Sequence, residues 1–348
     1  MKHLLIVAPN WLGDAVMALP AIADIRRGEP DASITIAAPP SIAPLFDLVN
    51  GVRACRCEPS VLGRFVGTTP GSVFDAALLL PNSFHSAVAV FRAGIPKRWG
   101  YRTDWRGPLL TRAVPRPHRP SQGLHQVEYY QRLVQALGFV NGPNDPRLEV
   151  NDTVRTAGAD ALARAGWGGR SPVVALAPGA AYGGAKRWPP EYFADLTLAL
   201  ARDGVATAMV GSGADAPTGK EIEARLRGQN GRSRTLNLIG ATDLPTLAGV
   251  LVVCRALVTN DSGAMHLAAA LGVRVTAVFG PTNEYETGPR GWVRLTPDMT
   301  YETRASAHAV LANPVACRPC MLRECPIDHR CMRGVGVDRV LAEARRML

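Results

Sequence analysis

Short apolar runs alternate with longer amphipathic stretches along most of this chain. In the first half, Leu4–Ala8, Ser33–Ala38 and Phe74–Leu80 have the pattern of buried strands, and a stretch with helical spacing follows each of them. Such alternation is typical of parallel strands joined by crossover helices. The pattern therefore predicts an α/β domain in which helices are layered on a parallel sheet.

A polar segment rich in Gly, Pro and Asn, Asn141–Pro146, interrupts the alternation and is a candidate hinge. Beyond it the pattern restarts with five further strand candidates: Val173–Ala177, Val205–Val210, Thr235–Ile239, Ala256–Thr259 and Val273–Phe279. We expect two Rossmann-like domains, residues 1–150 and 151–348, whose parallel sheets face each other across an interdomain cleft. The last helical stretch, Val337–Met347, is expected to pack back across the hinge.

Composition supports this picture of a folded, two-domain protein. The 348 residues exceed a typical single domain, and 47% hydrophobic against 20% charged residues argue against disorder. The net charge of +10 indicates an acidic partner, such as phosphate, nucleic acid or an anionic membrane surface.

No stretch of the sequence has the roughly 20 apolar residues that a spanning helix needs. The longest apolar run, Leu244–Val258, contains Pro245 and Arg255, and the N-terminal run Leu4–Ala8 has the pattern of a first buried strand rather than a signal peptide. We therefore predict a cytoplasmic protein whose seven cysteines are reduced.

Ligands of open α/β sheets bind outside the carboxyl ends of the strands, so the strand-to-helix junctions are the candidate sites. The first junction, Asn10–Asp14, leads into a predicted helix at Ala15–Arg26. Asp14 at a helix start is commonly an N-cap, yet a carboxylate there is also suited to act as a general base. Gly13 permits close approach of another group.

Three glycines and a pair of cations mark the junction that opens the second half, between Ala177 and Pro189. Backbone amides there can wrap a diphosphate, and Lys186 can neutralise charge on a departing phosphate. A flexible surface loop is the alternative. The next junction, Val210–Asp215, offers glycines and an acid where nucleotide-binding folds often hold a ribose, although so short a pattern is common.

Two further junctions carry polar residues and glycine. In Thr259–His266 a strand ends in polar residues before a helix of small residues, whose first amides would point at an anion. His266 on that helix also has the pattern of a buried, hydrogen-bonded core residue. Phe279–Thr282 closes the following strand with a tight turn and a hydroxyl. Together these turns predict a pocket for a nucleoside diphosphate.

Basic and aromatic residues alternate between positions 92 and 119. The eight cations are Arg92, Lys97, Arg98, Arg102, Arg106, Arg112, Arg116 and Arg119, against the single acid Asp104. This combination is also found in nucleic-acid-binding proteins. Because the other motifs predict a pocket rather than a long groove, we favour a phosphate-bearing acceptor or the anionic inner leaflet, and no nucleic acid. A solvated charged loop is the plain alternative.

Four cysteines cluster near the C-terminus with the spacing C-x2-C-x4-C-x5-C: Cys317, Cys320, Cys325 and Cys331. In a reducing compartment they can hold zinc, but the second pair is spaced more widely than in zinc ribbons. Buried free thiols are the outcome that we favour.

Taken in order, these junctions resemble those of the bacterial ADP-heptose:lipopolysaccharide heptosyltransferases, above all the members that add the second heptose of the inner core. The resemblance runs from the first strand to nearly the last helix, and it rests on Asn10–Asp14, Pro178–Gly179 with Lys186–Pro189, Asn260–Gly263 with Met265–His266, Phe279–Thr282, and the Cys317–Cys331 cluster. Ala180 and Ala181 stand where first-heptose enzymes tend to carry Thr-Thr. Phosphate contacts there must therefore come from backbone amides.

The resemblance implies a GT-B architecture with the donor in the C-terminal domain and the acceptor in the N-terminal one. It implies an inverting transfer from ADP-L-glycero-D-manno-heptose to heptosyl-Kdo-lipid A, without an obligatory metal. Asp14 would then be the general base, and Lys186 would stabilise the leaving ADP. The residues expected at the donor are Gly179, Ala180, Ala181, Asp215, Asp261, Ser262, Gly263, Met265, His266, Gly280, Pro281 and Thr282. Those expected at the acceptor are Asn10, Gly13, Arg98 and Arg102.

The chemistry of a nucleotide sugar is consistent with these roles, because the enzyme must mainly align the attacking hydroxyl, remove its proton and stabilise the diphosphate. Alternatives are transfer at another core position and a non-catalytic module that binds nucleotide sugars or nucleic acid. A hydride-transfer enzyme is disfavoured, because the first junction lacks the Gly-x-Gly-x-x-Gly fingerprint.

Overall fold

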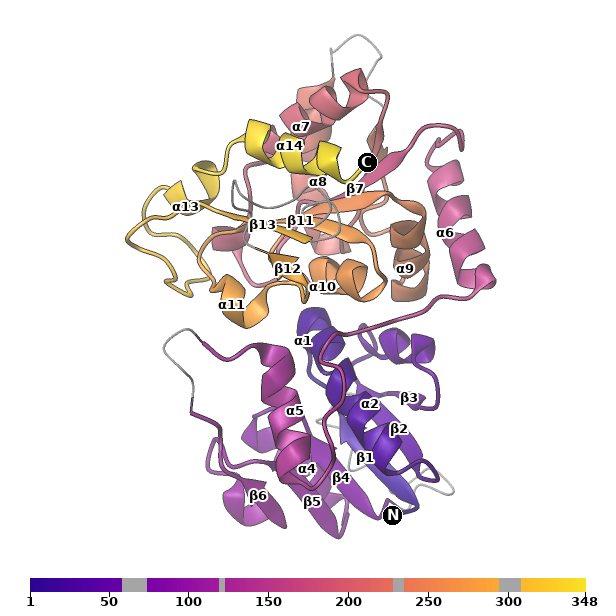
Figure 1. Cartoon of the computed structure of the whole chain (residues 1–348), viewed down its shortest axis with the longest axis vertical. Coiled ribbons are helices and arrows are strands. Elements are labelled where there is room, and N and C mark those ends of the chain that lie inside the picture. Colours follow the sequence, from indigo (N-terminus) through magenta and orange to yellow (C-terminus); the bar gives the residue numbers. More distant parts are fainter. Residues whose placement is uncertain (58–73, 119–122, 228–234, 294–307) are drawn as a thin grey trace. The chain divides into compact units, whose positions relative to one another are not determined.

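The computed structural model describes residues 1–57, 74–118, 123–227, 235–293 and 308–348, so Arg119 of the basic stretch lies outside the described residues. The chain divides into two compact units, Met1–Glu149 and Val150–Leu348, and each unit contains its own parallel sheet covered by helices (Figure 1).

The sheet of the first unit has the order β3-β2-β1-β4-β5-β6, and all its neighbouring strands are parallel. Its strands are β1 His3–Val7, β2 Ser33–Ala38, β3 Arg53–Arg56, β4 Ala76–Leu79, β5 Lys97–Tyr101 and β6 Arg112–Val114. Its helices are α1 Leu12–Met17, α2 Leu19–Gly28, α4 Phe84–Arg92 and α5 Gln126–Ala136, with 3-10 helices η1 Ala43–Leu48 and η3 Gly107–Leu109. The order reverses between β1 and β4, which makes the carboxyl end of β1 the switch point where ligands bind in such sheets.

The helix predicted at Ala15–Arg26 is interrupted. Helix α1 ends at Met17, and α2 starts at Leu19 with Pro20 in its first turn. Proline has no backbone N–H and fixes its own φ, so it suits the first turn of a new helix better than the interior of a continuous one.

The predicted hinge is hydrogen-bonded to the first unit. Buried Asp24 on α2 accepts from the backbone N–H of Gly142 (2.9 Å) and from Gln131 Nε2 (2.9 Å). The same Gln131 amide donates to the carbonyls of Gly142 (3.4 Å) and Pro143 (3.3 Å). The start of this segment is therefore fixed against α2 and α5.

The sheet of the second unit has the order β12-β13-β11-β10-β7-β8-β9 and is also parallel throughout. Its strands are β7 Val173–Ala177, β8 Ala206–Met209, β9 Thr235–Asn237, β10 Ala256–Asn260, β11 Arg274–Phe279, β12 Trp292–Val293 and β13 His308–Ala312. Its helices are α6 Asp152–Arg164, α7 Pro190–Arg202, α8 Ala216–Leu226, α9 Leu244–Val253, α10 Gly263–Ala270, α11 Glu284–Thr287, α13 Arg330–Arg333 and α14 Val337–Arg346, with 3-10 helices η4 Gly184–Lys186 and η5 Gly213–Asp215. Here the switch point lies between β7 and β10.

Helices cover both faces of this second sheet (Figure 1). Helices α7, α8, α13 and α14 share one core with the sheet, centred on the fully buried Trp188 and Phe193. Helix α10 packs against β10 and β11, and α9 contacts both α10 and α6. Helix α14 packs on α7, β10 and β11 of its own unit. Within the described residues, no helix combines the length and the apolar character needed to cross a bilayer.

Candidate active site

Asp14 lies in the first turn of α1, directly after the switch-point strand of the first unit. The N-cap of this helix is Trp11, whose side chain makes no capping bond, so the interpretation of Asp14 as the N-cap is wrong. A carboxylate in the first turn is stabilised by the helix dipole. Asn10 is exposed on the same turn, and Gly13 and Asp14 are half-buried. The residues predicted at this junction therefore do share one turn.

Tyr130 on α5 binds Asp14, and no local pattern in the sequence indicates this contact. Tyr130 is 3% exposed, and its hydroxyl donates a hydrogen bond to the Asp14 carboxylate and receives one from the Gln126 amide. Burial first, and then the charge of Asp14, raises the pKa of Tyr130 well above its usual value. The phenol therefore keeps its proton and remains a donor to Asp14 at neutral pH.

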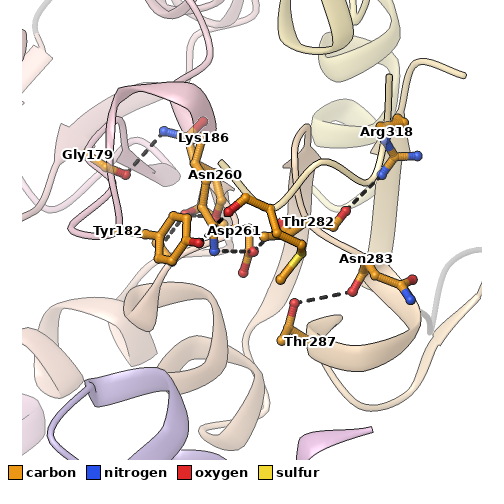
Figure 2. Close-up of polar contacts among 12 residues, drawn as sticks. Gly179, Tyr182, Lys186, Asn260, Asp261, Thr282, Asn283, Thr287 and Arg318 are labelled. Atoms are coloured by element: carbon orange, nitrogen blue, oxygen red, sulfur yellow. Dashed lines mark hydrogen bonds and ion pairs between the residues drawn. The ribbon is translucent and has the colours of Figure 1, made fainter. Parts of the chain in front are cut away.

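A buried cation lies at the switch point of the second unit. Lys186 Nζ is 2.6 Å from Asp261 Oδ2, and the Thr282 hydroxyl donates to the same oxygen at 2.6 Å (Figure 2). The side chains of Lys186 and Asp261 are only 11% and 5% exposed. The three residues follow β7, β10 and β11, so three of the predicted junctions meet at one carboxylate.

Asn260, at the end of β10, holds the junction that carries Lys186. Its Oδ1 accepts from the backbone N–H of Trp188 (3.0 Å), and its Nδ2 donates to the carbonyls of Pro178 (2.8 Å) and Gly179 (3.2 Å). The amide thus ties both ends of the loop after β7. We had not predicted this role. An asparagine closing an otherwise apolar strand was the signal available in the sequence.

Asp215 joins the turns after β7 and β8. Its Oδ2 accepts from the Ser212 N–H and hydroxyl, both at 2.9 Å, in a capping box. A Cβ added at Gly179 would lie 2.1 Å from Asp215 Oδ1, so only glycine fits there. The carboxylate therefore has a structural task in the turn, and its predicted contact with a ribose stays a prediction.

The helix after β10 presents its start at the same edge of the sheet. Ser262 is its N-cap, with its hydroxyl 2.9 Å from that of Thr259, and Gly263 opens the helix. Met265 is 0% exposed, so its side chain packs in the core and is not available to a donor, contrary to our expectation. His266 is buried on the same helix.

The remaining predicted donor residues differ in exposure. In the loop after β7, Ala180 is buried and Ala181 is exposed. In the turn after β11, Pro281 and Thr282 are buried. A Cβ at Gly280 would lie 2.3 Å from Met332 Sδ, so this glycine is required by packing against α13.

The basic stretch is not a loop, because it contains β5, η3 and β6. Arg106 is fully buried and donates to the carbonyl of Tyr101 (2.9 Å), the Ser86 hydroxyl (3.2 Å) and the carbonyl of Pro81. Burial lowers its pKa to about 10, which still leaves it charged at neutral pH. This arginine therefore stabilises the fold and is not available to an acidic partner.

The two arginines predicted at the acceptor lie at different places on β5. Arg98, near the amino end, donates to the carbonyls of Ile95 (2.6 Å) and Leu109 (2.7 Å). Arg102 follows the carboxyl end and is exposed. Because β1 and β5 run parallel in one sheet, Arg102 belongs to the same edge as Asn10 and Gly13. Arg98 does not.

The four C-terminal cysteines line one cavity of about 220 Å³. Their thiols are free, but Cys317 and Cys320 are exposed and Cys325 is half-buried. The expectation of buried thiols is therefore right only for Cys331, whose pKa is raised by burial. Across the described ranges, no three His, Cys, Asp or Glu side chains are placed to hold a metal ion.

Two parallel sheets, each with its polar turns at a switch point, define the GT-B class of glycosyltransferases. The structure of the Escherichia coli ADP-heptose lipopolysaccharide heptosyltransferase II superposes with a TM-score of 0.81 at 28% identity, covering 100% of this chain and 98% of that one. An E. coli heptosyltransferase solved with ADP has the same fold, with a TM-score of 0.70 at 18% identity and full coverage of both chains.

The model of glycosyltransferase family 9 (heptosyltransferase) matches residues 68–329, which is more than half of the chain. Lipopolysaccharide heptosyltransferase 2 of E. coli K12 is 31% identical over 303 residues, 82% of this chain and 85% of that protein. Lipooligosaccharide heptosyltransferase 2 of Haemophilus influenzae is 32% identical over 300 residues, 82% of this chain and 86% of that protein. The chain therefore belongs to glycosyltransferase family 9, the heptosyltransferases.

Proposed function

We propose that this enzyme transfers heptose from ADP-L-glycero-D-manno-heptose to the first heptose of Kdo-lipid A, with inversion at the transferred carbon. The observation that carries the proposal is the buried Lys186–Asp261–Thr282 cluster at the β7/β10 switch point. A cation and helix-start amides at this position suit a diphosphate. Identity of 31% to heptosyltransferase 2 supports the choice of donor and acceptor.

The second unit would hold ADP-heptose. The backbone amides of the loop after β7 and those at the start of α10 would bind the diphosphate. Lys186 would stabilise the negative charge that grows as the bond between the sugar and the diphosphate breaks. Asp261 holds the ammonium in place and is itself held by the Thr282 hydroxyl. ADP needs no proton to leave.

The first unit would hold the acceptor, with Asp14 as general base. The acceptor hydroxyl attacks the anomeric carbon, its proton passes to Asp14, and ADP departs in a single displacement. One carboxylate suffices for this route, because no covalent sugar intermediate forms. The step uses no metal ion, so transfer is expected to continue in the presence of EDTA.

Arg102, Asn10 and Gly13 are the residues proposed at the acceptor side. The acceptor is an acidic glycolipid anchored in a membrane, so the enzyme would work in the cytoplasm in peripheral contact with the anionic inner leaflet.

A transfer assay tests the proposal. The purified enzyme is incubated with ADP-heptose and either Kdo-lipid A or heptosyl-Kdo-lipid A, and products are followed by mass spectrometry and NMR of the new linkage. We expect one added heptose, of inverted configuration, only on the heptosylated acceptor. Transfer to Kdo-lipid A alone would assign another core position. Donor binding without transfer to either acceptor would contradict the proposal in favour of a binding module.

A further inference from the structure

The irregular segment between β13 and α13, residues 313–329, contacts the turn that follows β11. Arg318 Nε donates to the carbonyl of Gly280 (2.9 Å), and Arg318 Nη2 donates to that of Thr282 (3.2 Å). The backbone N–H of Met321 donates to the carbonyl of Pro281 (2.9 Å). All three carbonyls of the turn are thus bound by two residues of this segment.

The same segment also contacts the loop after β7 that carries Lys186. The Ala185 N–H donates to the carbonyl of Arg323 (2.9 Å), and the Gly184 N–H donates to Glu324 Oε1 (3.0 Å). The Tyr182 hydroxyl donates to the carbonyl of Met321 (2.7 Å). Residues 313–329 therefore connect two of the turns that make up the candidate donor site.

Arg318 is the charged centre of this connection. Its side chain is 13% exposed and pairs at 2.8 Å with Glu284, which is 8% exposed. The planar guanidinium binds two carbonyls and a carboxylate at once, which the single ammonium of a lysine cannot reproduce. Arg318 therefore holds the backbone of Thr282, whose hydroxyl is left to bind Asp261.

From Thr282 the contacts continue to the catalytic candidate. The Thr282 hydroxyl donates to Asp261, and Asp261 pairs with Lys186 (Figure 2). We propose that Arg318 is a positioning residue for Lys186, acting through Thr282 and Asp261 without touching the substrate. The inference rests on the proposed function of Lys186 at the diphosphate. It assigns to the cysteine-bearing segment the task of holding the donor site in shape.

Arg318→Gln and Thr282→Val test the two links. Each is expected to weaken ADP binding and to lower kcat by about 10- to 100-fold, the scale of a small misplacement in an active site. Thr282→Ser keeps the hydroxyl and should retain most of the rate, and Arg318→Lys should recover only part of it. Arg330→Gln is the matched control, since Arg330 is an exposed arginine whose side chain pairs only with exposed Asp328 among the described contacts. Its kinetics should be unchanged.

A double-mutant cycle separates positioning from a general loss of structure. In a Lys186→Ala background, Arg318→Gln should cause little further loss of ADP affinity, because its effect passes through Lys186. If the losses of ADP affinity in the two single variants multiply in the double variant, the proposal is overturned. Full ADP affinity in a folded Arg318→Gln protein would also overturn it. If Arg318→Gln does not fold, the ADP affinity and kcat of Thr282→Val alone test the proposal.

One readout does not depend on the proposed function. Reaction of Lys186 with an amine-acylating reagent, followed by mass spectrometry, should be faster in Arg318→Gln and in Thr282→Val than in the parent and in Arg330→Gln. If Lys186 is labelled faster in the two variants but the parent protein does not bind ADP, the proposed function is wrong and the positioning role still holds. If the labelling rate of Lys186 is the same in the variants as in the parent, the positioning role is wrong.

Discussion

Asp14 and Tyr130 form a hydrogen-bonded pair in which the neutral phenol limits the movement of the charged carboxylate. A carboxylate on a turn can rotate, and the hydrogen bond from a fully packed phenol limits that rotation. Gln126 donates to the phenol from the preceding turn of α5, so the phenol is itself oriented. A general base gains from such fixation, because proton transfer requires the acceptor oxygen to stay within hydrogen-bond reach.

Asp14→Asn removes the base and keeps the shape of the turn. We expect ADP affinity to be unchanged, because Asp14 belongs to the first unit and ADP is proposed to bind in the second. The rate of transfer should fall by about 10²- to 10⁴-fold, the usual contribution of a general base. ADP titration calorimetry and initial rates measure the two quantities. A variant that retains turnover would remove Asp14 from this role.

Tyr130→Phe removes one hydrogen bond to a charged group, which contributes about 1.5–3 kcal/mol and corresponds to a loss of about tenfold or more in kcat. Because burial raises the pKa of Tyr130, the phenol stays protonated, and the ratio of parent to variant rates should be constant across neutral and mildly alkaline pH. Tyr129→Phe is the control, since that hydroxyl bonds Asn82 instead. Equal losses in both variants would contradict a specific role for Tyr130.

At the scale of elements, the contact between α6 and α9 depends on two glycines. A Cβ added at Gly158 would lie 2.0 Å from the carbonyl carbon of Gly249, and one added at Gly249 would lie 2.1 Å from the carbonyl oxygen of Val154. The backbones of the two helices therefore touch. Glycine inside a helix ordinarily costs about 1 kcal/mol relative to alanine, so the close packing must offset this cost.

Gly158→Ala should therefore destabilise the protein although alanine is the better helix former. Overpacking of this kind costs about 1–3 kcal/mol, and here the clash is with backbone, which cannot rotate away. Gly168→Ala is the matched control, because a Cβ there meets no atom within 4 Å. The midpoint of urea unfolding measures both. A higher midpoint for Gly158→Ala would show that the helices can separate at little cost.

Most of the central strands were predictable, and two of the missed strands share a physical cause. Strand β7 lies at Val173–Ala177 as the apolar run predicts, because a strand buried on both faces must be apolar throughout. Strands β5 and β6 were missed because their cations suggested solvent exposure. In fact Arg98 and Arg112 bind backbone carbonyls, Arg112 at the end of α5, where a cation also suits the helix dipole.

Site residues were predictable where the functional side chain lies close in sequence to the end of a strand. Lys186 was expected at the donor because a cation after a strand end suits a diphosphate, and Asp261 because the family resemblance implies it. Tyr130 and Arg318 escaped notice because their partners lie far away in the sequence, and nothing local to α5 or to the cysteine segment indicates Asp14 or Thr282. Met265 was misplaced because the motif gives a residue's position along α10 but not the face that it occupies.

At the scale of the whole molecule, some of the excess cations can meet an acidic partner, and others are engaged within the fold. The net charge is +10, yet Arg98, Arg106 and Arg112 of the basic stretch are engaged with backbone carbonyls. Arg92, Lys97 and Arg102 remain exposed on the first unit. Attraction to an acidic membrane can therefore arise in two ways, from the net charge of the chain or from Arg102, the one of these three that follows the carboxyl end of β5 at the acceptor edge.

Vesicle co-sedimentation distinguishes these two origins. The enzyme is expected to bind vesicles that contain anionic phospholipid and not neutral ones. Binding should disappear as salt is raised to about 1 M, because the Debye length then shrinks from about 10 Å at 0.1 M to about 3 Å. Arg102→Gln should weaken binding more than Arg225→Gln, which removes the same charge from an exposed arginine on α8 of the second unit. Equal weakening would assign the attraction to net charge alone, and salt-resistant binding would mean that apolar contacts rather than cations hold the enzyme at the membrane.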